Sequence, residues 1–229
     1  MPLLEIEQLK KSFHTPDGDT QTVIDVENFS LEEKSQIALR GESGSGKTTF
    51  LNLIAGILKP DSGVIRIAGR EMSALCEGAR DRLRATTVGY IFQTFNLLQG
   101  YNCLENVLLG MSFGRGADRE FTTALLKRVG LADRLHHRPR QLSIGQQQRV
   151  AVARALANHP KLVLADEPTG NLDHNNARES LKLIRETCRE NGAALLLVSH
   201  DGEVLSQFET VLDLEKINSA LRAPHSALA

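Results

Sequence analysis

Gly41-Glu42-Ser43-Gly44-Ser45-Gly46-Lys47-Thr48 is the stretch that decides the fold. It matches the pattern GxxxxGK[ST], whose glycines permit positive φ angles, so that successive N–H groups can converge on phosphate oxygens. A predicted strand, residues 36–39, precedes the stretch, and a helical pattern over residues 47–58 follows it. The amino terminus of a helix adds positive potential at such a loop. This context favours a nucleoside triphosphate site over the alternative, a flexible Gly-Ser turn.

Two side chains of this loop have distinct predicted roles. Lys47 supplies a point charge for the β- and γ-phosphates, and Thr48 offers a hydroxyl group to Mg²⁺. The residues predicted to bind the triphosphate are Gly41, Glu42, Ser43, Gly44, Ser45, Gly46, Lys47, Thr48 and Thr49.

An apolar segment at residues 162–165 ends in two acids, Asp166 and Glu167. In a parallel sheet, ligands gather at the carboxyl ends of the strands, where the phosphate loop also lies. We therefore expect Asp166 to hold Mg²⁺, directly or through water, and Glu167 to orient and deprotonate an attacking water. The alternative is a capped strand end with two surface acids.

The remaining pattern is that of a doubly wound α/β chain. Residues 3–9, 23–31, 64–67 and 194–199 are predicted strands, and residues 176–190 form a crossover helix. Asp118 and Ser143 are candidate amino-terminal caps of two further helices, ending near Gly130 and Asn158.

Composition limits the class of protein. The 229 residues carry a formal net charge of −1, which gives no electrostatic footprint for nucleic acid. The longest apolar run, residues 193–198, is far shorter than the roughly 20 residues that span a bilayer. The amino terminus is not predicted to be a signal peptide. We interpret the three cysteines, which are far apart in the sequence, as reduced packing residues. Any membrane task would therefore need another polypeptide to supply the spanning helices.

One further motif selects a family among the many that use phosphate loops. Leu142-Ser143-Ile144-Gly145-Gln146-Gln147-Gln148-Arg149 resembles the LSGGQ signature of ABC ATPases. Gln93 is similar to the family's Q-loop glutamine, Asp173 to its D-loop aspartate and His200 to its switch histidine. Phe13 occupies the place of the aromatic residue that stacks on adenine, although packing in the core is the alternative. The resemblance covers the chain from Leu3 to about Leu214.

The resemblance implies an α/β fold: a P-loop NTPase (RecA-like) core with an N-terminal antiparallel β subdomain and an inserted α-helical subdomain. The single ABC ATPase domain would span residues 1–222. Within it, residues 1–93 and 156–222 would form the core and β subdomain, and about 94–155 the helical subdomain. Residues 223–229 would form a flexible tail.

The same resemblance implies ATP as substrate, Mg²⁺ as cofactor and a dimer that sandwiches two ATP molecules. In each ATP site, Lys47, Glu167 and His200 would be the catalytic residues. Mg²⁺ would be held by Thr48, Gln93 and Asp166. The signature residues Ser143, Gly145 and Gln146 would contact the nucleotide bound to the other subunit, with Asp173 nearby.

Two residues depart from the family pattern. Ile144 stands where the first signature glycine is usual, and a β-branched residue disfavours positive φ. Because Gly145 is retained, we expect a working signature, of altered strength. Phe13 replaces the commoner tyrosine and keeps the stacking face.

The implied partners are a second copy or a paralogue and an integral membrane permease-like subunit, with no nucleic acid. The implied location is cytoplasmic, on the inner face of the cell membrane. The sequence of residues 92–98 and 165–173 resembles that of one branch of the family, which includes lipoprotein-releasing, macrolide-efflux and cell-division ATPases. Residues 95–98 and 104–109 could form the docking groove or internal core. Other readings are mechanotransmission without substrate passage, a soluble ABC-type ATPase in DNA repair or translation, and a P-loop kinase.

Overall fold

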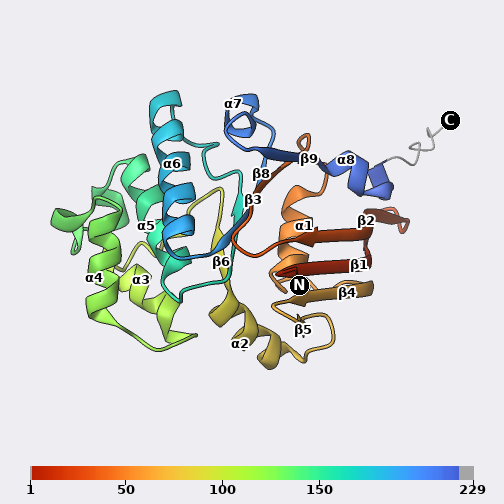
Figure 1. Cartoon of the computed structure of the whole chain (residues 1–229), viewed down its shortest axis with the longest axis horizontal. Helices are drawn as coiled ribbons and strands as arrows, with labels where there is room; N and C mark the ends of the chain where they lie inside the picture. Colours follow the sequence, from red (N-terminus) through yellow and green to blue (C-terminus); the bar gives the residue numbers. More distant parts are fainter. Residues whose placement is uncertain (1, 222–229) are drawn as a thin grey trace.

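A computed structural model describes the chain from residue 2 to residue 221. An antiparallel sheet forms one end of the molecule (Figure 1). Its order is β2-β1-β4-β5, from β1 (Leu4–His14), β2 (Thr20–Leu31), β4 (Ser62–Ile67) and β5 (Arg70–Glu71). The first two strands extend beyond the predicted ranges because their ladder continues past a register shift, from Ser12–Thr22 to His14–Thr20. The predicted tail, residues 223–229, lies outside the described residues.

A parallel sheet forms the centre of the molecule. Its order is β6-β7-β8-β3-β9, from β3 (Gln36–Arg40), β6 (Val88–Ile91), β7 (Leu162–Asp166), β8 (Ala194–Ser199) and β9 (Thr210–Asp213). Alternate residues of one strand enter two different cores: Leu162 and Leu164 join one, Val163 and Ala165 the other. Because both faces are covered, β7 and β8 read as continuous apolar runs.

The helices cover these faces unequally. Helix α1 (Lys47–Ile54) lies between the two sheets, and α3, α4 and α5 gather at the end away from the antiparallel sheet (Figure 1). The other helices are α2 (Glu77–Thr87), α3 (Cys103–Ser112), α4 (Arg119–Arg128), α5 (Ile144–Leu156), α6 (His174–Glu190), α7 (Gly202–Leu205) and α8 (Leu214–Ile217), with 3₁₀ turns at Ala132–Arg134, Pro139–Gln141 and Ser219–Leu221.

The predicted helix caps are largely confirmed. Asp118 accepts a hydrogen bond from the Phe121 N–H at 2.9 Å, and Ser143 caps α5. The helix predicted over residues 47–58 is shorter, because the chain turns at Gly56, whose φ is 67°. Helix α6 begins at His174, two residues earlier than predicted, because Asp173 caps it.

One other expectation needs correction, and the structure distinguishes two alternatives that the sequence left open. Cys103 and Cys188 are buried packing residues as expected, but Cys76 is exposed at the start of α2. Within residues 95–98 and 104–109, most apolar side chains, including Leu97, Leu104 and Val107, are core rather than docking surface. Leu98 is an exception because it is exposed. Among residues 2–221, no helix has the length and apolar character needed to cross a bilayer.

Gly89 determines how closely α5 approaches the sheet. A Cβ atom added at Gly89 would overlap the carbonyl oxygen of Ala155 in α5. We expect Gly89→Ala to lower the free energy of unfolding by about 1 to 3 kcal/mol, the usual penalty of overpacking. Urea denaturation measures this loss. Gly100→Ala is the matched control, because nothing lies within 4 Å of its added Cβ; equal stability of both variants would contradict the prediction.

Candidate nucleotide-binding and catalytic site

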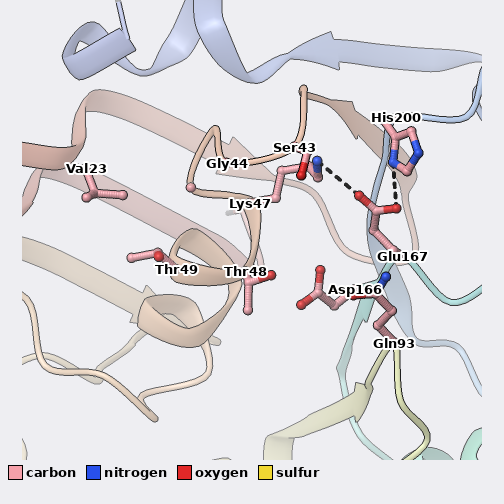
Figure 2. Close-up of a pocket in the computed structure, with 11 residues that line it drawn as sticks. Val23, Ser43, Gly44, Lys47, Thr48, Thr49, Gln93, Asp166, Glu167 and His200 are labelled. Carbon is pink, nitrogen blue, oxygen red and sulfur yellow. Dashed lines mark ion pairs between the residues drawn. The ribbon is translucent and has the colours of Figure 1, made fainter. Parts of the chain in front are cut away.

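A cavity of about 340 Å³ opens where the phosphate loop meets the carboxyl ends of the parallel strands (Figure 2). Gly44 and Gly46 have φ angles of 81° and 87°, the left-handed conformation that glycine adopts without strain. Gly46 also caps α1, so the amino terminus of that helix faces the cavity. The lining residues are Val23, Ser43, Gly44, Gly46, Lys47, Thr48, Thr49, Gln93, Asp166, Glu167 and His200.

A chain of polar contacts crosses this cavity (Figure 2). Lys47 Nζ lies 3.0 Å from Glu167 Oε1, and His200 Nδ1 lies 2.7 Å from Glu167 Oε2. Lys47 also donates to the carbonyl oxygens of Gly41 and Glu42, each at 2.7 Å. Lys47 and Glu167 are both buried, whereas 61% of the His200 side chain is exposed. The predicted cation, Lys47, and the predicted switch residue, His200, therefore both contact the carboxylate of the predicted base, Glu167.

The backbone at Glu167 is unusual. Its φ is 43°, a left-handed conformation that a non-glycine residue rarely adopts. The strain is of order 1 to 3 kcal/mol, and such strain clusters at functional sites. It turns the chain immediately after β7, so that Asp166 and Glu167 both line the cavity.

Asp166 provides the oxygen chemistry of a divalent-cation site. Burial raises the pKa of its carboxyl group, and a hydrogen bond from the Thr48 hydroxyl partly opposes that rise. Gln93 lines the same cavity. A carboxylate, a hydroxyl and an amide carbonyl are all oxygen donors, which suit Mg²⁺. The residues present therefore fit this ion.

The signature residues lie apart from this cavity. Ser143 and Gln146 form a reciprocal cap at the start of α5, with N–O distances of 3.3 and 3.0 Å. A Cβ added at Gly145 would lie 3.2 Å from Asn176 Oδ1. The Asn176 amide also donates to Asp173 at 2.6 Å, and this bond lowers the pKa of the Asp173 carboxyl. The signature turn and Asp173 are thus neighbours through Asn176.

Ile144 adopts an ordinary conformation. It is the first residue of α5, and its φ is not positive, so the substitution for glycine causes no backbone strain. Its side chain is 54% exposed. The close approach at the signature instead involves Gly145, where an added Cβ would require the Asn176 side chain to shift slightly.

The structure does not bring Phe13 into the cavity lining. Phe13 is 41% exposed on β1, and its ring lies 5.5 Å from Lys11 Nζ. Val23 of β2 lines the cavity instead, and its Cγ1 would lie 3.0 Å from a Cβ added at Gly46. No local sequence pattern marks the contact between Val23 and the phosphate loop, because the two segments are far apart in the chain. The sequence therefore could not predict Val23.

The glycine-rich loop between β3 and α1, with an acid pair ending β7, defines a P-loop nucleoside triphosphatase.

The family model described as "ABC transporter" matches residues 24–170. The lipoprotein-releasing system ATP-binding protein LolD of Shewanella oneidensis is 40% identical over 98% of each chain, and that of Pseudomonas syringae pv. tomato is 46% identical over 82% of this chain and 84% of its own.

Two solved structures of the cassette MJ0796 show the same fold. A dimeric post-hydrolysis state bound to ADP and Pi has a TM-score of 0.84 at 32% identity, covering 95% of each chain. A second dimeric structure has a TM-score of 0.82 at 34% identity, covering 92% of this chain and 94% of its own. The chain belongs to the ABC transporter family, as an ATP-binding subunit that hydrolyses ATP.

Proposed function

We propose that ATP is hydrolysed in the cavity that Lys47 and Glu167 line. The observation that carries this proposal is that Lys47 and His200 both contact the Glu167 carboxylate. Loop N–H groups and Lys47 would bind the β- and γ-phosphates. Glu167 would orient the attacking water and accept its proton, while His200 would hydrogen-bond the γ-phosphate. Such a positioned base contributes typically about 10² to 10⁴ in rate. Phe13 remains our candidate for stacking on adenine.

We propose that Thr48, Asp166 and Gln93 hold Mg²⁺. When bound there, the ion would neutralise charge on the β- and γ-phosphate oxygens. The hydrogen bond between Thr48 and Asp166 supports this assignment, because it brings two oxygen donors together beside Lys47. We also propose the subdomain boundaries predicted above, with residues of about 94–155 forming the helical unit.

We propose that the working form is a dimer in which Ser143, Gly145 and Gln146 of one copy complete the site of another. These residues are separate from the cavity lined by Lys47, so one chain does not bring both halves together. The amino terminus of α5 has no acidic residue in its first turn, and its dipole favours a bound anion. Asp173, which touches Asn176 beside Gly145, would lie at the same interface.

We propose that an integral membrane subunit docks in a second groove, of about 490 Å³. Two of its lining side chains are large, apolar and exposed: Phe113 at 71% and Ile57 at 45%. The groove also contains Phe92, the residue before Gln93, so a docked partner would lie beside the nucleotide cavity. The chain itself would then be peripheral, on the cytoplasmic face of the membrane.

The groove assignment predicts the effect of a charge at Phe113. We expect Phe113→Asp to reduce the amount of membrane subunit that co-purifies in detergent by about tenfold or more, because an exposed aromatic anchor often dominates an interface. ATP hydrolysis by the isolated chain should be unchanged. Leu221→Asp is the control, since Leu221 is also exposed but lies outside the groove. Full recovery of the partner with Phe113→Asp would contradict the assignment.

The relatives' name suggests a cargo. We propose that the chain supplies the energy of ATP hydrolysis to a lipoprotein-releasing type of system. The alternative form of this coupling is that mechanical work is transmitted across the membrane and no substrate passes through it. Affinity purification of the tagged chain from detergent extracts tests this proposal. Recovery of an integral membrane subunit supports it, whereas recovery of DNA or ribosomes would favour the soluble ATPase alternative.

A further inference from the structure

The segment that carries Gln93 has an unusual backbone. Phe95 and Asn96 are consecutive non-glycine residues with φ angles of 55° and 49°. Left-handed backbone at such residues persists only where the surroundings hold it in place. Their local hydrogen bonds, from Phe95 N to Phe92 O at 3.3 Å and from Asn96 N to Thr94 O at 2.6 Å, span only two or three residues. The conformation therefore needs a partner from elsewhere in the chain.

Arg154 of α5 is that partner. Its Nη1 donates to the Asn96 carbonyl oxygen and its Nη2 to the Phe95 carbonyl oxygen, each at 2.6 Å. Within residues 2–221, no carboxylate forms an ion pair with Arg154. Burial lowers the pKa of its guanidinium group. A poorly solvated cation without an acid binds carbonyl oxygens strongly, and only a planar fork can bind two at once.

The segment is held at its other end as well. Asn171, which follows β7 and the acid pair, donates from Nδ2 to the Gln93 carbonyl oxygen at 2.7 Å. The stem of Arg154 lies against Gly110 of α3, where an added Cβ would approach its Cγ at 3.1 Å. The segment that carries Gln93 is thus held by Asn171, which follows β7, and by Arg154 of α5.

We propose that Arg154 is a positioning residue that sets the place of Gln93 in the nucleotide cavity and ties it to the signature helix. Ser143 caps the amino terminus of α5, and Arg154 lies in the last turn of the same helix. A shift of α5 would therefore move the carbonyl oxygens of Phe95 and Asn96 with it. Arg154 also lines the 490 Å³ groove, so contact with a partner there reaches Gln93 through one side chain. This inference rests on the proposed role of Gln93 in holding Mg²⁺.

A double-mutant cycle on the full chain tests the inference. Gln93→Ala, Arg154→Lys and the double variant are compared by their kcat, KM and equilibrium affinity for ATP. Lysine keeps the charge but cannot bind both carbonyl oxygens in one plane. We expect each single variant to lower kcat by about 10- to 100-fold, because small misplacements of catalytic groups have effects of this size. ATP affinity should stay within about twofold, because the phosphate loop is untouched.

Non-additivity is the decisive result. If Arg154 acts through Gln93, the double variant should be no slower than Gln93→Ala alone, whereas independent effects multiply. Multiplied effects, or an unchanged kcat in Arg154→Lys, would overturn the inference and leave the proposed site intact. An unchanged kcat in Gln93→Ala would overturn the proposed role of Gln93 and the inference with it.

Arg185→Gln is the matched control. Arg185 lies on α6 and donates to the Gln207 carbonyl oxygen at 2.6 Å, the same length as the Arg154 bonds, but its bonds to Gln207 and Gln36 do not involve the segment that carries Gln93. Its kcat should equal that of the wild type. Arg154→Gln, with thermal unfolding and ATP affinity as folding controls, provides a second variant. A loss of kcat in Arg185→Gln equal to that in Arg154→Gln would mean a general effect on the fold and would overturn the inference.

Discussion

A Glu167→Gln variant should bind ATP normally and hydrolyse it about 10² to 10⁴ times more slowly, the usual contribution of a positioned base. Glutamine has the shape of glutamate, so the contacts to Lys47 and His200 can persist as hydrogen bonds, but the amide cannot accept the proton of water. Phosphate release measures kcat, and equilibrium titration measures the affinity. We expect ATP to hold the variant as a dimer on gel filtration.

Glu203→Gln is the control for this substitution. Glu203 pairs with His174 at 2.8 Å on the exposed surface near the same end of β8, so its variant makes the same chemical change outside the cavity. Glu203→Gln should hydrolyse ATP at the wild-type rate. Normal turnover by Glu167→Gln would remove Glu167 as the base.

The second large effect concerns Ser143. Ser143→Arg places a long cation at the start of α5, where we propose that two copies meet across a nucleotide. Hydrolysis should fall by about 10² or more, the size expected when reacting groups are misplaced, while ATP binding to the isolated chain remains normal. Ser206→Arg is the control, because Ser206 is exposed at the end of α7, outside the Lys47 cavity.

A mixing experiment separates contact between copies from contact within one chain. Lys47→Ala and Ser143→Arg should each have very low activity when pure. In a mixed dimer, the intact Lys47 of one chain faces the intact Ser143 of the other, so mixing should restore part of the activity. If Ser143 instead acts within its own chain, every site in the mixture carries a defect and no activity returns, which would contradict the proposed dimer.

The sequence predicted most of the residues that line the candidate site, because the chemistry of that site is local. The phosphate loop needs glycines, a lysine and a hydroxyl in one short run, and the acid pair needs only a buried strand before it. Lys47, Asp166, Glu167 and His200 do converge on one cavity. Each comes from the carboxyl end of a parallel strand or the loop after it, a placement that the apolar runs already indicated.

The sequence could not predict contacts made between distant segments. Val23 enters the cavity through the packing of β2 on the phosphate loop, and Arg154 reaches the carbonyls of Phe95 and Asn96 across more than fifty residues. No periodicity marks such pairs. The end of α1 was missed for a different reason: apolar residues continue beyond Ile54, and only the positive φ of Gly56 shows where the chain turns.

The left-handed angle at Glu167 also sets a limit on engineering this enzyme. Glycine and asparagine tolerate that angle better than glutamate, so either replacement would relieve the backbone strain, but it would also leave the buried Lys47 without its ion-pair partner. Neither residue could take the role of base that we propose for Glu167. A design protocol that ranks substitutions by backbone conformation alone would favour them here, and would remove both the ion pair with Lys47 and the carboxylate proposed for catalysis.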